Sequence, residues 1–402
     1  MKRLKALGFL AVILLLLTQL YAVTPIWITG FEHGLAVPAT SGLGLYDTAA
    51  GTLAIQSSVK RSGDYALQIY PLTSLVSNVG KKFTSAVYVG SVYIRFAAWP
   101  SADASIVQGE TPTEGFSIYV DVTAHRFFPA ISSLTAGSVE GPTLALNTWY
   151  RLDCKFNPAA NPWLLDWAVD GTPMTQYSGA LAATTMYQLH LGFTAARTGN
   201  LFFDDLVLST TAGDYPIGEQ AVIGLPANAE GTHNNAANTM EDVDGNDIDG
   251  VTYLAYNKLK EIPWITTVNT DFVRQATIGT GNYCEVNFAD TTHNNILGAM
   301  LAIQYASAGT GANNGKTYVL DSNNQSTTVY SGTMALAIAS YKSAIVTLPS
   351  GGWTMAHVNA LRARLGYSSD VIDIPYWEAM ILEVAYAADI PITWIPKVII
   401  IQ

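Results

Sequence analysis

Apolar and polar residues alternate with a period of two through residues 147–208. The clearest runs are 149–156, 164–169 and 202–208, and Gly, Pro or Asn residues stand between them. Successive side chains of a strand point to opposite sides, so this alternation is typical of strands with one buried face. The segment therefore predicts a series of half-buried strands, and helical periodicity is almost absent from it.

The same pattern predicts that residues 23–215 form one β-sandwich. Further strands are expected at 53–58, 65–70, 87–97, 115–122 and 187–193, separated by turns such as 61–64. Together with the opening segment WITGFEHG (27–34), the strands within 147–208 resemble the laminin-G-like, concanavalin-A-type jelly roll. That resemblance implies an architecture but no single activity, because lectins, glucanases, adhesins and virus structural proteins share the fold.

The second half of the chain is expected to form another β-sandwich, over residues 240–388, after a polar linker at 216–239. Its strands are predicted at 272–276, 282–288, 296–306, 316–321, 326–331, 340–348 and 377–386. One helix is predicted near 355–365, because Thr354 can cap it, apolar residues recur at helical spacing and Gly366 can end it. The predicted fold class is all-β, with two jelly-roll-like sandwiches and one short α-helix in the second.

Four segments of the second half resemble structural or tail-fibre proteins of tailed phages. They read MEDVDGNDIDG (240–250), DFVRQ (271–275), GWTMAHVNAL (352–361) and EAMILEV (378–384). The resemblance implies a virion structural protein, either a tail fibre or a decoration protein. The N-terminus of the chain favours a different, host-encoded origin.

Residues 1–22 have the layout of a secretory signal peptide, because Lys2, Arg3 and Lys5 precede an apolar run and Ala22 offers a cleavage site. The alternative is a retained anchor, since the apolar run reaches the length that can span a bilayer. The protein is therefore expected to be secreted or on the cell surface, in contact with a membrane only through an uncleaved leader; the virion is the alternative location. A net charge of −11, with no cluster of Lys and Arg, argues against nucleic-acid binding.

Sequence signatures of hydrolytic catalysis are missing. Glucanases of the jelly-roll fold carry two carboxylates on one strand face, in the pattern Glu-x-Asp-x-(x)-Glu, and no such run occurs. No Gly-x-Ser-x-Gly or His-Glu-x-x-His segment occurs, and the six histidines are scattered singly. We therefore expect a non-enzymatic structural or surface protein that assembles with itself. A phage virion structural protein is the first alternative, and a divergent glycoside hydrolase or lyase is the second.

Carbohydrate is the best-motivated ligand. Strand alternation places aromatic rings beside carboxylate and guanidinium groups on one predicted face, where rings can stack on sugars and polar groups can bond hydroxyls. The candidate residues are Tyr93, Arg95, Tyr119, Asp121, Trp149, Arg151 and Asp153. The alternative is a solvated or domain-contacting sheet face held together by cross-strand ion pairs.

Calcium is the one candidate cofactor. The acidic segment 241–249 offers the hard oxygen ligands that calcium prefers, although it lacks the spacing of an EF-hand. The candidate ligands are Asp242, Asp244, Asn246, Asp247 and Asp249. The alternative is a solvated acidic loop.

The C-terminal tail, residues 389–402, is the predicted assembly element. Its apolar, β-branched composition would favour aggregation if it were exposed, so the tail must be covered. Either it forms the last strand of its own sandwich, or it adds as an arm to the sheet of a neighbouring subunit. The residues concerned are Ile392, Trp394, Ile395, Val398, Ile399, Ile400 and Ile401.

Overall fold

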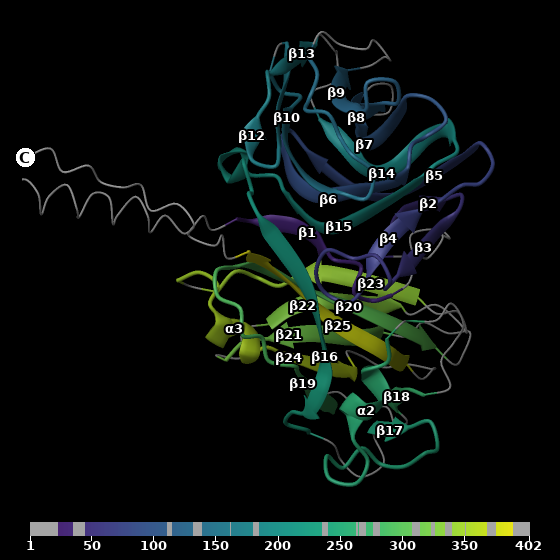
Figure 1. Cartoon of the computed structure of the whole chain (residues 1–402). Helices are drawn as coiled ribbons and strands as arrows, with labels where there is room; N and C mark the ends of the chain where they lie inside the picture. The colour runs from purple at the N-terminus through teal and green to yellow at the C-terminus, as the bar shows by residue number, and fades with distance from the viewer. Residues whose placement is uncertain are drawn as a thin grey trace, which may run out of the picture.

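The computed structural model describes residues 23–34, 45–110, 115–131, 139–160, 162–179, 185–234, 240–262, 264, 271–275, 282–307, 314–322, 326–333, 340–349, 351–367 and 375–388. Over these residues the protein is all-β, and Figure 1 shows two stacked β-sandwich units. The predicted fold class is therefore confirmed. The predicted leader and the C-terminal tail, with all seven candidate assembly residues, lie outside the described residues.

The first sandwich consists of two antiparallel sheets. Sheet A has the strand order β12 (Thr172–Pro173), β11 (Trp163–Val169), β10 (Trp149–Asn157), β6 (Tyr88–Ala98), β15 (Asn200–Ser209), β4 (Ala66–Ile69) and β3 (Leu53–Gln56), with β1 (Pro25–Thr29) beside β15 and β13 (Tyr177–Gly179) beside β11. Sheet B has the order β2 (Thr48–Ala50), β5 (Leu75–Ser85), β14 (Met186–Arg197), β7 (Ala104–Glu110), β8 (Gly115–Asp121) and β9 (Arg126–Ile131). The inward positions of both sheets are apolar, as the alternation predicts.

The second sandwich is one sheet that folds over on itself through a shared strand. Its order is β17 (Met240–Asp242), β18 (Val273–Gln275), β25 (Pro375–Ala387), β16 (Gln220–Glu230), β19 (Tyr283–Phe288), β24 (Arg362–Tyr367), β21 (Asn314–Leu320) and β22 (Ser326–Thr333), while β20 (Ile296–Ser307) joins β25 to β23 (Ser340–Ile345). Short helices α2 (Ala255–Leu259) and α3 (Met355–Asn359) and the 3-10 turn η1 (Ala212–Asp214) complete the described elements.

The predicted linker at 216–239 is wrong over residues 220–230, because β16 lies there between β25 and β19. Strand β16 contacts β15 of the first sandwich and pairs with β25 and β19 in the second. Its buried residues Ala221, Val222, Leu225 and Ala227 follow no strict alternation, since neighbours cover both of its faces. Pro226 and the small residues also give this strand a composition that is typical of a loop.

The predicted helix at 355–365 is half right. Thr354 caps α3, accepting a hydrogen bond from the His357 N–H at 3.1 Å, but the helix ends at Asn359. Residues 362–367 form β24 instead, so Gly366 lies inside a strand. Alternation explains the change. Ala363 and Leu365 are buried, and the residues that alternate with them point the other way. Arg362 and Arg364 both pair with the carboxylate of Glu285.

The two sandwiches share an apolar core. Trp27, Ile28 and Phe31, on or just after β1, belong to the same buried cluster as Met300 and Ile381 of the second sandwich. Strand β1 pairs with β15 on one side and contacts β20, β23 and β25 on the other. Burial of large apolar side chains across this junction fixes the sandwiches against each other.

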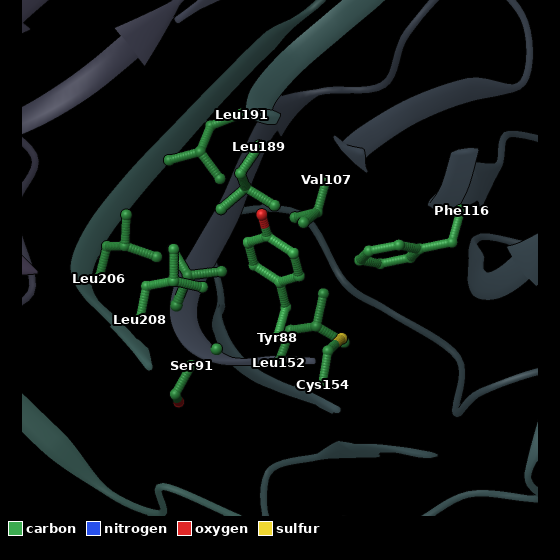
Figure 2. Close-up of a pocket in the computed structure, with 12 residues that line it drawn as sticks. Tyr88, Ser91, Val107, Phe116, Leu152, Cys154, Leu189, Leu191, Leu206 and Leu208 are labelled. Atoms are coloured by element: carbon green, nitrogen blue, oxygen red, sulfur yellow. The ribbon is translucent and has the colours of Figure 1, made fainter. Parts of the chain in front are cut away.

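The core of the first sandwich contains a small cavity (Figure 2). It has a volume of about 30 Å³, and side chains such as Tyr88, Phe116, Leu152 and Leu191 surround it. A void of this size holds about one water molecule, and its apolar wall offers few hydrogen-bond partners. The cavity is therefore a packing gap of the core and no ligand site.

Candidate binding cleft between the two sandwiches

A cleft of about 380 Å³ opens between the two sandwiches. Its residues are Ser57, Lys60, Asp64 and Tyr65 from the β3–β4 connection, Glu32 after β1, Gly224 and Pro226 from β16, Ile381 from β25, and Lys260 and Ile262 after α2. Figure 1 shows β3 and β4 at the edge of the first sandwich that faces the second. We call this site the interdomain cleft. Its polar groups come from segments far apart in the sequence, so only the packing of the two sandwiches assembles it.

Glu32 lies in the floor of the interdomain cleft and is only 2% exposed. Its Oε2 accepts a hydrogen bond from the Asp64 N–H at 2.9 Å, whereas its buried Oε1 has no hydrogen-bond partner. Its own N–H donates to Oε1 of Glu383, a fully buried carboxyl of β25, at 2.9 Å. This contact ties the end of β1 to the central strand of the second sandwich.

Burial shifts both carboxyls towards their protonated forms, Glu32 more than Glu383. Burial, opposed in part by the Asp64 N–H donor, raises the pKa of Glu32 from 4.5 to about 9, and the nearby charge of Glu383 adds to the rise. Burial likewise raises the pKa of Glu383 from 4.5 to about 7, against hydrogen bonds from Glu32 and Thr29. Glu32 is therefore uncharged at neutral pH.

The turn at 61–64, predicted from the sequence, holds the carboxyl of Glu32 in place. Gly63 has a φ of 56°, and a Cβ added there would lie 1.9 Å from Glu32 Oε1. We expect Gly63→Ala to lower the free energy of unfolding by about 2 kcal/mol, from backbone strain and displacement of Glu32. Urea denaturation measures this, with Gly213→Ala as control, because a Cβ at Gly213 would meet nothing within 4 Å. Equal stability of the two variants would contradict the prediction.

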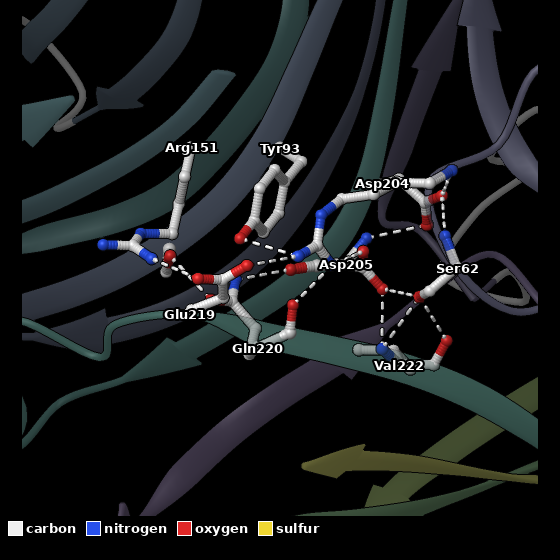
Figure 3. A network of polar contacts seen from close by, with 10 residues as sticks. Ser62, Tyr93, Arg151, Asp204, Asp205, Glu219, Gln220 and Val222 are labelled. Atoms are coloured by element: carbon white, nitrogen blue, oxygen red, sulfur yellow. Dashed lines mark hydrogen bonds and ion pairs between the residues drawn. The ribbon is translucent and has the colours of Figure 1, made fainter. Parts of the chain in front are cut away.

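A buried polar junction lies beside the cleft, formed by Arg61, Ser62, Tyr93, Asp204 and Asp205 with residues 219–222 (Figure 3). Arg61 Nη1 donates to Asp205 Oδ2 at 2.8 Å and to the carbonyl of Gln220 at 2.7 Å, and its guanidinium stacks 3.5 Å from the ring centre of Tyr93. Asp205, at a φ of 52°, accepts the Val222 N–H at 2.6 Å. The junction thus fastens β15, the 61–64 turn and β16 together.

The predicted carbohydrate-binding face is divided by the structure. Tyr93, Arg151 and Asp153 are buried, and Figure 3 shows Tyr93 and Arg151 beside Glu219 at the polar junction. Arg151 donates to Asp153 at 2.8 Å, and Asp153 accepts the Gly218 N–H at 3.2 Å. These three residues match the alternative of a domain-contacting face held by ion pairs. Arg95 and Trp149 form a cross-strand pair farther along the sheet and are half-buried.

Tyr119 and Asp121 lie on β8, in the other sheet, and so do not join the remaining candidates. Alternation along a strand assigns a face but no sheet, which is why the prediction merged them. Tyr119 shares the outer side of sheet B with polar residues that the prediction missed. They include Glu110, whose carboxylate lies 3.1 Å from His190 Nε2 and accepts a hydrogen bond from Gln108 at 3.0 Å. The sequence signal for this polar side was the alternation of Gln188 and His190 with Leu189 and Leu191.

The acidic loop at 241–249 uses its carboxylates internally. Asp242 Oδ1 accepts the N–H groups of Asp244 and Asn246 at 2.9 Å, and the Asn246 side chain donates to Oδ2 at 3.1 Å. Backbone N–H groups of residues 251–253 lower the pKa of Asp249 to about 2. The backbone of Asp247 forms an isolated antiparallel β-bridge with that of Glu241. Among the described residues, no group of three or more His, Cys, Asp and Glu side chains could hold a metal ion. The calcium site stays a prediction.

Two other observations concern the cysteines and the helices. Cys154 and Cys284 are both free and buried. In the part of the chain that the structure describes, no helix is long and apolar enough to span a bilayer.

No protein-family model and no curated protein matches the chain. Among solved structures, the carbohydrate binding module CBM66 from Bacillus subtilis is 13% identical with a TM-score of 0.30, over 43% of this chain and 99% of that one. Domain 4 of AbnA, a GH43 extracellular arabinanase from Geobacillus stearothermophilus in complex with arabinotriose, is 14% identical with a TM-score of 0.30, over 47% of this chain and 84% of that one. Trypanosoma rangeli sialidase in complex with sialic acid is 12% identical with a TM-score of 0.31, over 48% of this chain and 34% of that one.

The chain thus spans about a third of the length of the sialidase chains that it matches. At such identities and TM-scores these likenesses carry no argument about function. The resemblance to tailed-phage proteins gains no support from them and stays a prediction. The function must therefore be inferred from the geometry of this chain.

Proposed function

We propose that this protein is a non-enzymatic, exported surface protein that binds carbohydrate in the interdomain cleft. The observation that carries the proposal is the composition of the cleft wall. The wall combines polar and apolar groups that line the same space. The polar groups are the ammonium, carboxylate and hydroxyl groups of Lys60, Lys260, Asp64 and Ser57. The apolar surfaces belong to Tyr65, Pro226, Ile262 and Ile381. Sugars need both kinds of contact, because their hydroxyls form hydrogen bonds and their ring faces pack on apolar groups.

The size of the cleft also suits a small saccharide. Its volume of about 380 Å³ lies within the range of small-molecule sites. Its wall comes from both sandwiches, which share one core, so the site is largely formed before a ligand arrives. Preorganisation of this kind lowers the entropic cost of binding.

The carboxyl groups of the cleft support binding without hydrolysis. Two-carboxylate hydrolysis requires both groups to face the glycosidic bond, at separations of roughly 5 to 9 Å. Glu32 is covered by protein, with Oε2 bonded to a backbone N–H, and Glu383 is fully buried. Asp64 is 80% exposed but paired with Lys60 at 3.1 Å, which leaves the cleft with a single accessible carboxylate.

Blocking the cleft tests the proposal. Ser57 is exposed at its rim, so Ser57→Trp should fill the cleft without disturbing the core. On a glycan array we expect this variant to lose at least about tenfold in affinity, while Ala102→Trp, an exposed site in the β6–β7 connection, binds like the wild type. Unchanged binding by Ser57→Trp would place the glycan elsewhere. Release of reducing ends from a bound glycan would contradict the non-enzymatic assignment.

A further inference from the structure

The interdomain cleft has a charge that is opposite to that of the whole protein. Lys60 reaches it from the first sandwich and Lys260 from the second. Asp64 is the accessible acid in the wall, and it already pairs with Lys60 at 3.1 Å. Because Glu32 is uncharged at neutral pH, two ammonium groups face one carboxylate, giving the wall a net charge of +1 in a chain of net charge −11.

Lys260 is the cation available to a ligand. Its Nζ donates to Asn257 Oδ1 at 2.8 Å and lies 5.5 Å from the ring centre of Tyr256. Among the described residues Lys260 forms no ion pair, and its side chain is exposed. An ammonium group held by a neutral amide beside a cleft is free to pair with an incoming anion.

We infer that the interdomain cleft selects an anionic saccharide, a sugar unit bearing a carboxylate or sulfate group that pairs with Lys260. The inference rests on the proposed function, because it names the substrate class of the same site. A neutral sugar would leave the Lys260 charge without a partner in the cleft. An anionic sugar gains that charge-assisted contact while its ring packs against Tyr65 and the apolar residues of the wall.

Calorimetric titration with matched trisaccharides tests the inference. The probes are trigalacturonate, its carboxyl-reduced neutral counterpart, and a sulfated form of the neutral sugar. We expect the wild type to bind one or both anionic probes about tenfold more tightly than the neutral one, with a difference that shrinks at high salt. Lys260→Gln should remove this preference, because it should lower the affinity for the anionic probes about tenfold more than the affinity for the neutral probe.

The control is Lys82→Gln, which removes the same charge from an exposed position of β5 outside the cleft and should keep the preference. The two anionic probes separate a carboxylate ligand from a sulfate ester. If the wild type binds the neutral probe as tightly as the anionic ones, or if Lys260→Gln weakens all probes equally, the inference is overturned while the glycan site stands. If the wild type binds none of the three probes and the glycan array also shows no binding, both the inference and the proposed function are contradicted.

Discussion

Replacement of Arg61 by methionine should lower the free energy of unfolding by about 3–5 kcal/mol. Arg61 is the cation within 2.8 Å of Asp205, and both Asp205 and its neighbour Asp204 are fully buried. Methionine keeps much of the apolar stem but leaves the buried carboxyl of Asp205 without its compensating charge. Breaking a buried ion pair by removing one partner is among the most destabilising single changes. Chemical denaturation followed by tryptophan fluorescence measures the loss.

The matched control is Arg126→Met. Arg126 and Glu140 form an ion pair of nearly the same length, 2.7 Å, but each side chain is 41% exposed. Water screens such a pair, so its loss should cost less than about 1 kcal/mol. If the two variants are equally stable, the polar junction does not hold the sandwiches together in the way that its burial implies.

Glu32→Gln should make the protein more stable than the wild type at alkaline pH and leave it nearly as stable at acidic pH. Folding raises the pKa of Glu32 from 4.5 to about 9, so the folded protein keeps a proton that the unfolded chain releases. The stability contributed by this group is complete below pH 4.5 and is lost as the pH rises towards 9. The loss has a maximum slope of about 1.4 kcal/mol per pH unit. Glutamine resembles the protonated acid and carries no such loss.

Other buried groups also change the stability with pH. Comparing the wild type with Glu32→Gln separates their contributions from that of Glu32. Burial lowers the pKa of His33 from 6.5 to about 3, which removes stability as the pH falls below 6.5 in both proteins. Glu383, with its raised pKa of about 7, removes stability above pH 4.5 in both. Denaturation of wild type and variant across the pH range gives the difference due to Glu32. A difference that stays constant from acidic to alkaline pH would show that Glu32 is ionised in the folded protein.

Local alternation predicted strands well where one face meets a core and the other meets solvent or a polar junction. The strands that contain Trp149 and Phe202 are examples, since their side chains alternate between core and junction. Alternation could not say which strands become neighbours, and so it placed Tyr119 beside Tyr93 although they belong to different sheets. Register and pairing depend on contacts between distant segments, which no local pattern records.

The segments that sequence patterns misjudged have unusual surroundings. Strand β16 starts with three successive buried residues, 220–222, and is rich in small residues, so it shows no continuous alternation. In β24 the pairing of Arg362 and Arg364 with buried Glu285 overrides a helical spacing that continues from α3. Tertiary contacts decided both cases.

The interdomain cleft could not be predicted from the sequence. Its polar residues stand singly at 32, 57–65 and 260, and none belongs to a motif. The one local signal was the turn at 61–64, where Gly63 allows the positive φ that brings the turn against Glu32. The rest requires the packing of β16 and β25 under the β3–β4 connection.

The crystal structure of the protein with the tightest-binding oligosaccharide is the most direct measurement of where ligand binds. We predict that the saccharide lies in the interdomain cleft, with a ring against Tyr65 and an anionic group beside Lys260 Nζ. A saccharide bound on the outer side of sheet B over Tyr119, or beside Trp149 on sheet A, would contradict this assignment.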